Sequence, residues 1–179
     1  MKRMKWIGVV MIVVVAMVCV CAFAESGHQF DKATYVKVTK KNIGRILTGN
    51  ISPSTMKADM EKLISIGLDG CREHLGEPDA PAVEKKLLEI TIKSVDSMRG
   101  LSLDQIEEMW HEGGYLKSQG IDIMKLDHFS HAMCHYDSVL HPLTAILCLN
   151  EYERTQKEEY LDQMKAELAE VAEHMEHLD

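Results

Sequence analysis

Residues 52–75 have the sequence SPSTMKADMEKLISIGLDGCREHL, in which apolar side chains recur every three or four positions. This spacing is typical of one buried face of an α-helix. The apolar members of this face are Met56, Met60, Leu63, Ile64 and Leu68. Ser52 and Pro53 suit the start of a helix, and the Gly76–Pro81 segment is typical of a turn. The stretch therefore predicts a long amphipathic helix.

The same helical spacing continues on the C-terminal side of this stretch. A second helix is predicted from Pro81 to Gly100, and Ser102–Gln105 has the form of a capping box that begins a short third helix. A histidine-bearing helix is predicted from about Lys125 to Leu140. Together these patterns predict an all-α fold, a bundle of four to five helices.

The C-terminal part of the chain predicts a long helical segment. Pro142 either begins a new helix there or kinks a continuous one, and the helical pattern runs on to Glu176. The following residues form a short heptad seam: Leu161, Met164, Leu168, Val171, Met175 and Leu178. A seam of this length favours a helix that lies on a bundle, and the alternative is a helix that docks a partner or a second copy.

Residues 25–50 are the least regular part of the sequence. Thr34–Thr39 has the alternation of a short strand, although one strand alone is not stable, and an irregular arm or an early helix are the alternatives. We therefore divide the chain into a signal segment at 1–24, an N-terminal arm of uncertain structure at 25–50 and a helical bundle domain at 51–179.

The first residues have the pattern of a cleaved secretory signal peptide. Met1–Lys5 is basic, Trp6–Val20 is almost entirely apolar, and Ala22-Phe23-Ala24 supplies the small residues that signal peptidase requires. Cleavage is expected after Ala24, which predicts a periplasmic or secreted protein. The alternative is a retained N-terminal anchor, since the apolar run approaches the length of a membrane span.

The charge of the remaining chain excludes some classes of partner. The whole sequence has a formal net charge of −8, and loss of Lys2, Arg3 and Lys5 leaves 17 basic residues against 28 acidic ones, a charge of −11. Such a surface repels nucleic acid and anionic lipid and attracts cations. Three cysteines remain, Cys71, Cys134 and Cys148, which allow at most one internal disulfide and leave one thiol.

A histidine cluster is the main functional signal in the sequence. His128, His131 and His135 follow the i, i+3, i+7 spacing, which would place three imidazoles on one face of the predicted helix. Imidazole is the commonest biological metal ligand, so the spacing predicts a Cu, Zn or Ni site. His111 and His141 are candidates for further metal ligands, and Cys134 is a softer candidate ligand.

Haem is the second cofactor that this segment allows. His131–His135 differs from the c-type attachment motif Cys-x-x-Cys-His in its first position, which is histidine here. Cys134 would then form a single thioether and His135 would be the axial ligand. Haem held without a covalent bond, between two histidines, is the alternative.

Two histidines near the C-terminus carry a weaker signal. His174 and His177 lie among Glu170, Glu173 and Glu176, which could hold a cation loosely. We expect these imidazoles instead to be solvated or to favour the C-terminal end of their helix.

The sequence thus predicts an exported helical protein that binds a transition metal or haem in sensing, storage or delivery. The alternative is an acidic interaction module whose histidines are structural. The sequence shows no phosphate-binding loop and no dinucleotide fingerprint, so catalysis is not the favoured expectation.

Overall fold

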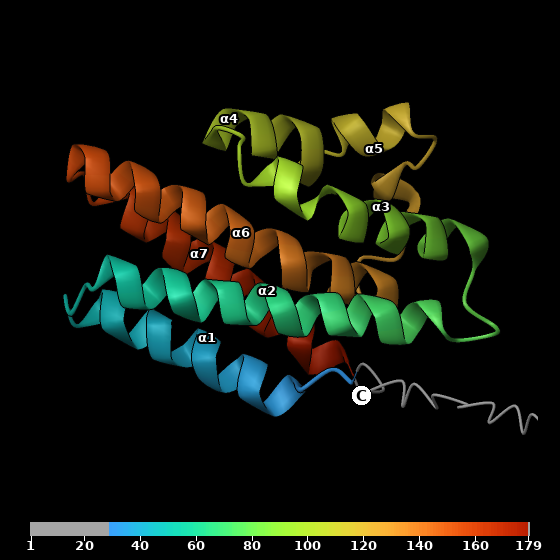
Figure 1. Ribbon diagram of the computed structural model, residues 1–179, viewed down its shortest axis with the longest axis horizontal. Coiled ribbons are helices and arrows are strands. Elements are labelled where there is room, and N and C mark those ends of the chain that lie inside the picture. Colours follow the sequence, from blue (N-terminus) through green and yellow to red (C-terminus); the bar gives the residue numbers. More distant parts are fainter. Residues whose placement is uncertain (1–28, 179) are drawn as a thin grey trace, which may run out of the picture.

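The computed structural model describes residues 29–178 (Figure 1), and every regular element in that range is helical. The predicted signal segment lies outside the described residues. The elements, in chain order, are α1 (Lys32–Leu47), α2 (Pro53–Leu75), α3 (Ala82–Met98), α4 (Leu103–Ile106), the π-helix η1 (Glu107–His111), α5 (Gly114–Ser118), the 3-10 helix η2 (Ile123–Lys125), α6 (His131–Thr155), α7 (Glu159–His174) and the 3-10 helix η3 (Met175–His177). The all-α prediction is confirmed.

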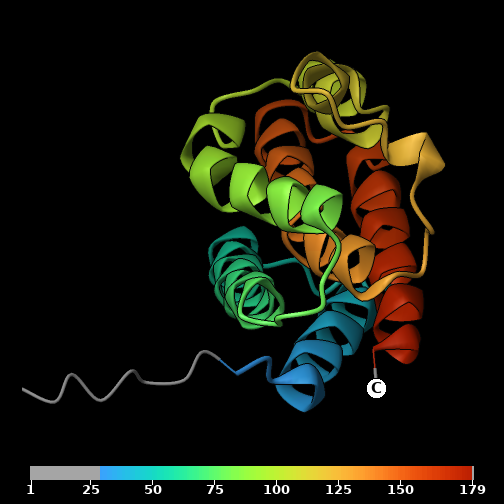
Figure 2. The ribbon, with the colours of Figure 1, turned by 90° about the vertical axis from the view of Figure 1, so that its right-hand side faces the viewer.

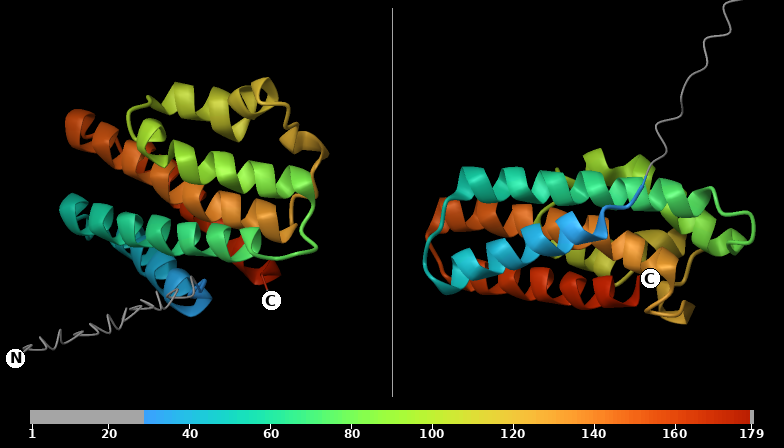
Figure 3. Two further views of the ribbon diagram at one scale, coloured as in Figure 1. Left: turned by 45° about the vertical axis from the view of Figure 1, so that its right-hand side comes forward. Right: turned by 90° about the horizontal axis from the view of Figure 1, so that it is seen from below.

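The first helix, α1, replaces the short strand considered for Thr34–Thr39. The Asp31 side chain accepts a hydrogen bond from the Thr34 backbone N–H and caps the helix. Tyr35, Val38 and Asn42 are buried at helical spacing, so this period decided the structure rather than the two-residue alternation. α1 packs against α2 and α7 and is part of the bundle (Figure 3).

The middle helices follow their local sequence signals. α2 and α3 lie within the predicted ranges, and the capping box is present, because Ser102 and Gln105 each accept a hydrogen bond from the other's backbone N–H. The short helix then widens into the π-helix η1, in which the Glu112 backbone N–H donates to the Glu107 carbonyl. Such π-turns often accompany functional sites.

The histidine-bearing helix α6 begins six residues later than predicted, at His131 rather than Lys125. Two polar side chains stop the helix from extending backwards. The Asp127 carboxylate accepts from the Phe129 backbone N–H, and the Ser130 hydroxyl accepts from the Met133 backbone N–H as an N-cap. His128 therefore lies in a turn before the helix.

Pro142 lies inside α6, which continues through it without a break. Proline has no N–H, so the Ser138 carbonyl loses its usual helical donor four residues later. The Tyr35 hydroxyl of α1 donates to that carbonyl at 2.8 Å and replaces the missing bond. The helical run expected from Pro142 to Glu176 is divided, since α6 ends where Gln156 takes a left-handed φ of 58° and α7 returns along α6.

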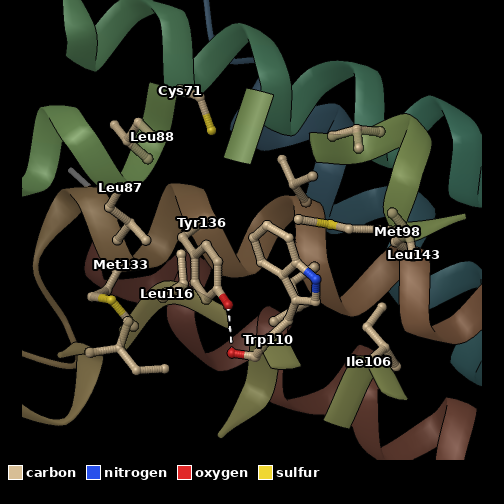
Figure 4. Packing of buried hydrophobic residues seen from close by; sticks show 14 of the residues in the cluster. Cys71, Leu87, Leu88, Met98, Ile106, Trp110, Leu116, Met133, Tyr136 and Leu143 are labelled. Carbon is tan, nitrogen blue, oxygen red and sulfur yellow. Dashed lines mark hydrogen bonds between the residues drawn. The ribbon is translucent and has the colours of Figure 1, made fainter. Parts of the chain in front are cut away.

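α6 is the central element of the bundle and contributes to two hydrophobic cores. In the first core, Trp110 and Tyr136 pack with residues of α2 and α3, and the Tyr136 hydroxyl donates to the Trp110 carbonyl (Figure 4). The second core lies between α1, α2, α6 and α7 and contains the C-terminal heptad seam. Figure 2, which views the bundle end-on, shows α6 beside α2, α3 and α7.

The structure also gives the positions of the heptad seam and the cysteines and the character of the helices. The heptad seam residues are 0–8% exposed, so this seam lies on the bundle. Cys71, Cys134 and Cys148 are all buried free thiols. Among residues 29–178, no helix combines the length and apolar character needed to cross a membrane.

The close approach of α2 to α6 generates a stability prediction. A Cβ at Gly67 would lie 2.7 Å from the Ser138 carbonyl oxygen and 2.9 Å from its carbon, both of which are backbone atoms. We expect Gly67→Ala to lower the free energy of unfolding by about 2–3 kcal/mol, because the two helices must separate. The measurement is urea unfolding followed by far-UV circular dichroism.

Gly44→Ala is the matched control for this substitution. Gly44 also lies inside a helix, but a Cβ there would meet nothing within 4 Å. It should leave stability unchanged or raise it by about 0.5–1 kcal/mol, through the lower backbone entropy of alanine in the unfolded chain. Equal effects of the two substitutions would contradict the close approach.

Candidate metal centre

Polar and ionisable side chains lie inside the bundle where α6 faces α7. Asp137 and His141 are four residues apart on α6, and both are buried. Glu167, Glu170 and His174 follow spacings of three and four on α7, which place them on one face of that helix, where Glu167 and His174 are buried and Glu170 is exposed. Because α7 returns along α6, the two sets of side chains meet.

Two more histidines reach this cluster from outside the two helices. His111 is the last residue of η1, and its Nε2 lies 2.9 Å from the Thr144 hydroxyl and 3.7 Å from Glu167 Oε2. His128 comes from the turn before α6, and its Nε2 lies 3.0 Å from His174 Nε2. The neighbouring Phe129 ring stacks on His177 with 4.0 Å between centroids, which holds this turn against the C-terminal end of α7 and η3.

The cluster contains three overlapping groups of donor atoms that could hold a metal ion. Within each group, the ligand atoms lie within 4.8 Å of one another. The groups are His111, His141 and Glu167; Asp137, His141 and His174; and His128, Glu170 and His174. We call their seven residues the α6–α7 cluster.

Two atoms in the α6–α7 cluster are buried without a hydrogen-bond partner. Asp137 Oδ2 and His174 Nδ1 lie 2.8 Å apart, yet their orientation does not make a hydrogen bond, and neither has another partner in the described structure. His174 is 1% exposed and Asp137 is 5% exposed. Together with His141, whose ring nitrogen lies within 4.8 Å of both, these two atoms could hold a cation.

Electrostatics differ between the two histidines near Glu167. Burial lowers the pKa of His111, although the Glu167 carboxylate opposes that shift. Burial also disfavours protonation of His141, but its 2.7 Å contact with Glu167 and the charges of Asp137, Glu167 and Glu170 outweigh burial and raise its pKa. Negative charge thus predominates around His141, which favours a proton or a metal cation there.

A pocket of about 230 Å³ connects the cluster to the surface. Its polar lining residues are His111, His128, Asp137, His141 and Glu170. Apolar residues such as Ile123, Met133 and Leu140 line the rest. An ion bound in the cluster could therefore exchange with solvent through this opening.

A smaller donor group lies on the other side of α6. His74 of α2 is buried, with Nε2 3.3 Å from Glu84 and Nδ1 3.1 Å from Glu77. With His131 and Glu77 it forms another group of three donors within 4.8 Å. A pocket of about 250 Å³ lies beside it, lined in part by Glu77, His131 and His135.

The spacing predicted that His128, His131 and His135 lie on one helix face, but the structure separates His128 from the other two. His128 precedes α6 and contacts His174, whereas His131 and His135 face His74, with ring centroids 6.2 and 6.0 Å away. Burial, followed by the neighbouring His74 and His131, lowers the pKa of His135 to about 4.

The other predicted residues are divided between the site and the core. His111 and His141 do lie together, beside Glu167. Cys134 is fully buried in the second hydrophobic core.

Sequence reasoning missed the contribution of α7. His174 was expected at the solvated end of a helix, but it is buried against Asp137 and His128. Glu167, Glu170 and His174 share a face next to the apolar heptad seam, and Asp137 and His141 repeat the four-residue spacing on α6. Polar residues at such positions were the available signal.

Comparison of the chain with models of protein families, with curated proteins and with solved structures finds no match in any of the three. The function is therefore inferred from the sequence and from the geometry of the cluster.

The burial of the cysteines generates a prediction about their reactivity. Burial raises the pKa of Cys71 to about 12 and that of Cys134 to about 11, and it also raises the pKa of Cys148. We expect all three thiols to resist iodoacetamide at pH 8 in the folded protein, because the thiolate is the nucleophile. Mass spectrometry should find three alkylated residues only after unfolding in guanidinium. Rapid labelling of Cys134 in the folded protein would contradict its burial.

Proposed function

We propose that this protein binds transition metal ions in the α6–α7 cluster and serves in their storage, delivery or sensing outside the cytoplasmic membrane. The observation that carries the proposal is the buried pair of Asp137 Oδ2 and His174 Nδ1, which lie 2.8 Å apart without a hydrogen bond, among five further donor residues. The export part of the proposal rests on the pattern of residues 1–24.

A purely structural role for the cluster fits these contacts less well. A buried polar atom without a partner costs about 1–3 kcal/mol, so a histidine network that only stabilises the fold should satisfy its atoms. A cation could satisfy the pair in two ways: it could bind both atoms, or it could bind His174 Nε2 and turn the Nδ1–H group toward Asp137 Oδ2. The acidic charge of the chain would also raise the concentration of cations near the pocket.

The donor set favours a metal ion over haem. Imidazole and carboxylate ligands suit Zn²⁺, Cu²⁺, Ni²⁺ and the divalent ions of iron and manganese. Covalent haem would require the Cys134 thiol, which lies in the second hydrophobic core. His135, the corresponding axial ligand, packs with Nδ1 so close to Gly70 that a Cβ there would lie 2.4 Å away.

Docking of a partner through the C-terminal heptads has less support. The seam residues from Leu161 to Leu178 are buried against α1 and α6. A partner helix could reach them only if α7 left the bundle, and this would also disrupt the α6–α7 cluster.

Zinc binding tests the proposed function directly. At a Zn²⁺ concentration of about 100 times Kd, we expect stabilisation by about 2.7 kcal/mol, which raises Tm by roughly 5–10 °C, because the ion binds only the folded state. Excess chelator should reverse the shift. The measurements are differential scanning calorimetry and metal analysis after desalting.

Variants assign this effect to the cluster. His141→Ala combined with His174→Ala should abolish the zinc-dependent shift, and the conservative Glu167→Gln should weaken it. Glu173→Gln is the matched control for Glu167→Gln, since Glu173 is an exposed glutamate of the same helix and belongs to none of the donor groups. A Tm that responds to neither zinc nor chelator, or equal loss in the Glu173 variant, would overturn the proposal.

A further inference from the structure

We infer that the α6–α7 cluster holds two metal ions, one on each side of Asp137, and that Asp137 orients a ligand of each ion. This inference rests on the proposed function and concerns how the ions are arranged. His111, His141 and Glu167 form the first triad, which is largely buried, and His128, Glu170 and His174 form the second triad, in which only His174 is buried. The two triads share no residue.

Each triad has the composition of a known type of metal site. Two imidazoles and one glutamate are the protein ligands of a class of zinc sites that keep a fourth position open. The first triad draws on η1, α6 and α7, and the second draws on α7 and the turn before α6. Each set therefore converges from separate segments of the fold, as metal ligands in helical bundles commonly do.

The two carboxylate oxygens of Asp137 lie near one ring of each triad. Its Oδ1 is 3.8 Å from His141 Nε2, and its Oδ2 is 2.8 Å from His174 Nδ1. The opposite nitrogens face the triads, since His141 Nδ1 is 2.7 Å from Glu167 and His174 Nε2 is 3.0 Å from His128 Nε2. A carboxylate that accepts a hydrogen bond from the outer N–H of a metal-bound histidine fixes the orientation of its ring, and an ion in each triad would turn these outer N–H groups toward Asp137.

A single central ion would use the donors less completely. It would bind Asp137, His141 and His174, and it would leave both glutamates of the cluster without a metal. The buried Glu167 carboxylate has His111 and His141 as its neighbours, so an ion in the first triad would compensate its charge. Two ions give both glutamates a metal partner.

The pocket gives both ions the same access to solvent. Its lining includes His111 and His141 of the first triad, His128 and Glu170 of the second, and Asp137 between them. The open coordination positions of the two ions would therefore face one shared space, where water or a small anion can complete both.

Counting zinc in variants of the full chain tests this arrangement. The protein is saturated with Zn²⁺, desalted and analysed for zinc per chain. His111→Ala with Glu167→Gln should lower the count by one, and so should His128→Ala with Glu170→Gln. All four substitutions together should lower it by two. Because only differences are used, an ion held by the His74 group would not affect the result.

Asp137→Asn separates the two-ion arrangement from the central ion. With two ions, the substituted amide would still contact both rings but orient them less well, so both ions should remain with a 10–100-fold weaker affinity. With one central ion, this substitution removes a ligand and should abolish binding. Far-UV circular dichroism of each metal-free variant checks that it is folded. The single Glu167→Gln and Glu170→Gln proteins are measured in the same way as the mildest changes to each triad.

The outcomes distinguish the inference from the proposed function. If the four substitutions together remove only one ion and Asp137→Asn abolishes its binding, the two-ion arrangement is overturned and metal binding by the cluster stands. If no variant of the cluster changes the zinc count, both are overturned.

Discussion

The structure depends on the burial of α6 on several sides by other helices. α2 approaches so closely that Gly67 has no space for a side chain over the Ser138 backbone, and α3 and α7 cover further sides. Water hardly reaches the polar side chains of a helix in such a position, so each of these side chains needs a hydrogen-bond partner from a neighbouring helix. This constraint makes the unpartnered atoms of Asp137 and His174 informative.

The sequence predicted the helices well where local signals agree with burial. The spacing in α2, the turn before α3 and the capping box at Ser102 all act within a few residues, so they could be seen without the fold. The predicted start of α6 was six residues too early because the side chains of Asp127 and Ser130 accept hydrogen bonds from backbone N–H groups and prevent an earlier helical turn. In the sequence this signal is less conspicuous than the apolar period.

The site could be predicted only in part, because its members are far apart in the sequence. His111, His128 and His141 were recognised as candidate ligands, but their true neighbours Glu167 and His174 lie on a helix that returns after the turn at Gln156. Helical spacing indicates which residues share a face, and it does not indicate which two faces meet. Once α7 is placed against α6, Glu167 and His174 beside its apolar seam contact the candidate histidines.

The hydroxyl of Tyr35 has a consequence for the order of assembly. It supplies the hydrogen bond that Pro142 cannot give to the Ser138 carbonyl, at a point between Asp137 and His141. Until α1 docks, this turn of α6 lacks a backbone hydrogen bond and is free to bend. The separation of two residues in the α6–α7 cluster therefore depends on a helix that contributes no residue to the cluster, so the cluster reaches its final geometry only when the whole bundle has closed.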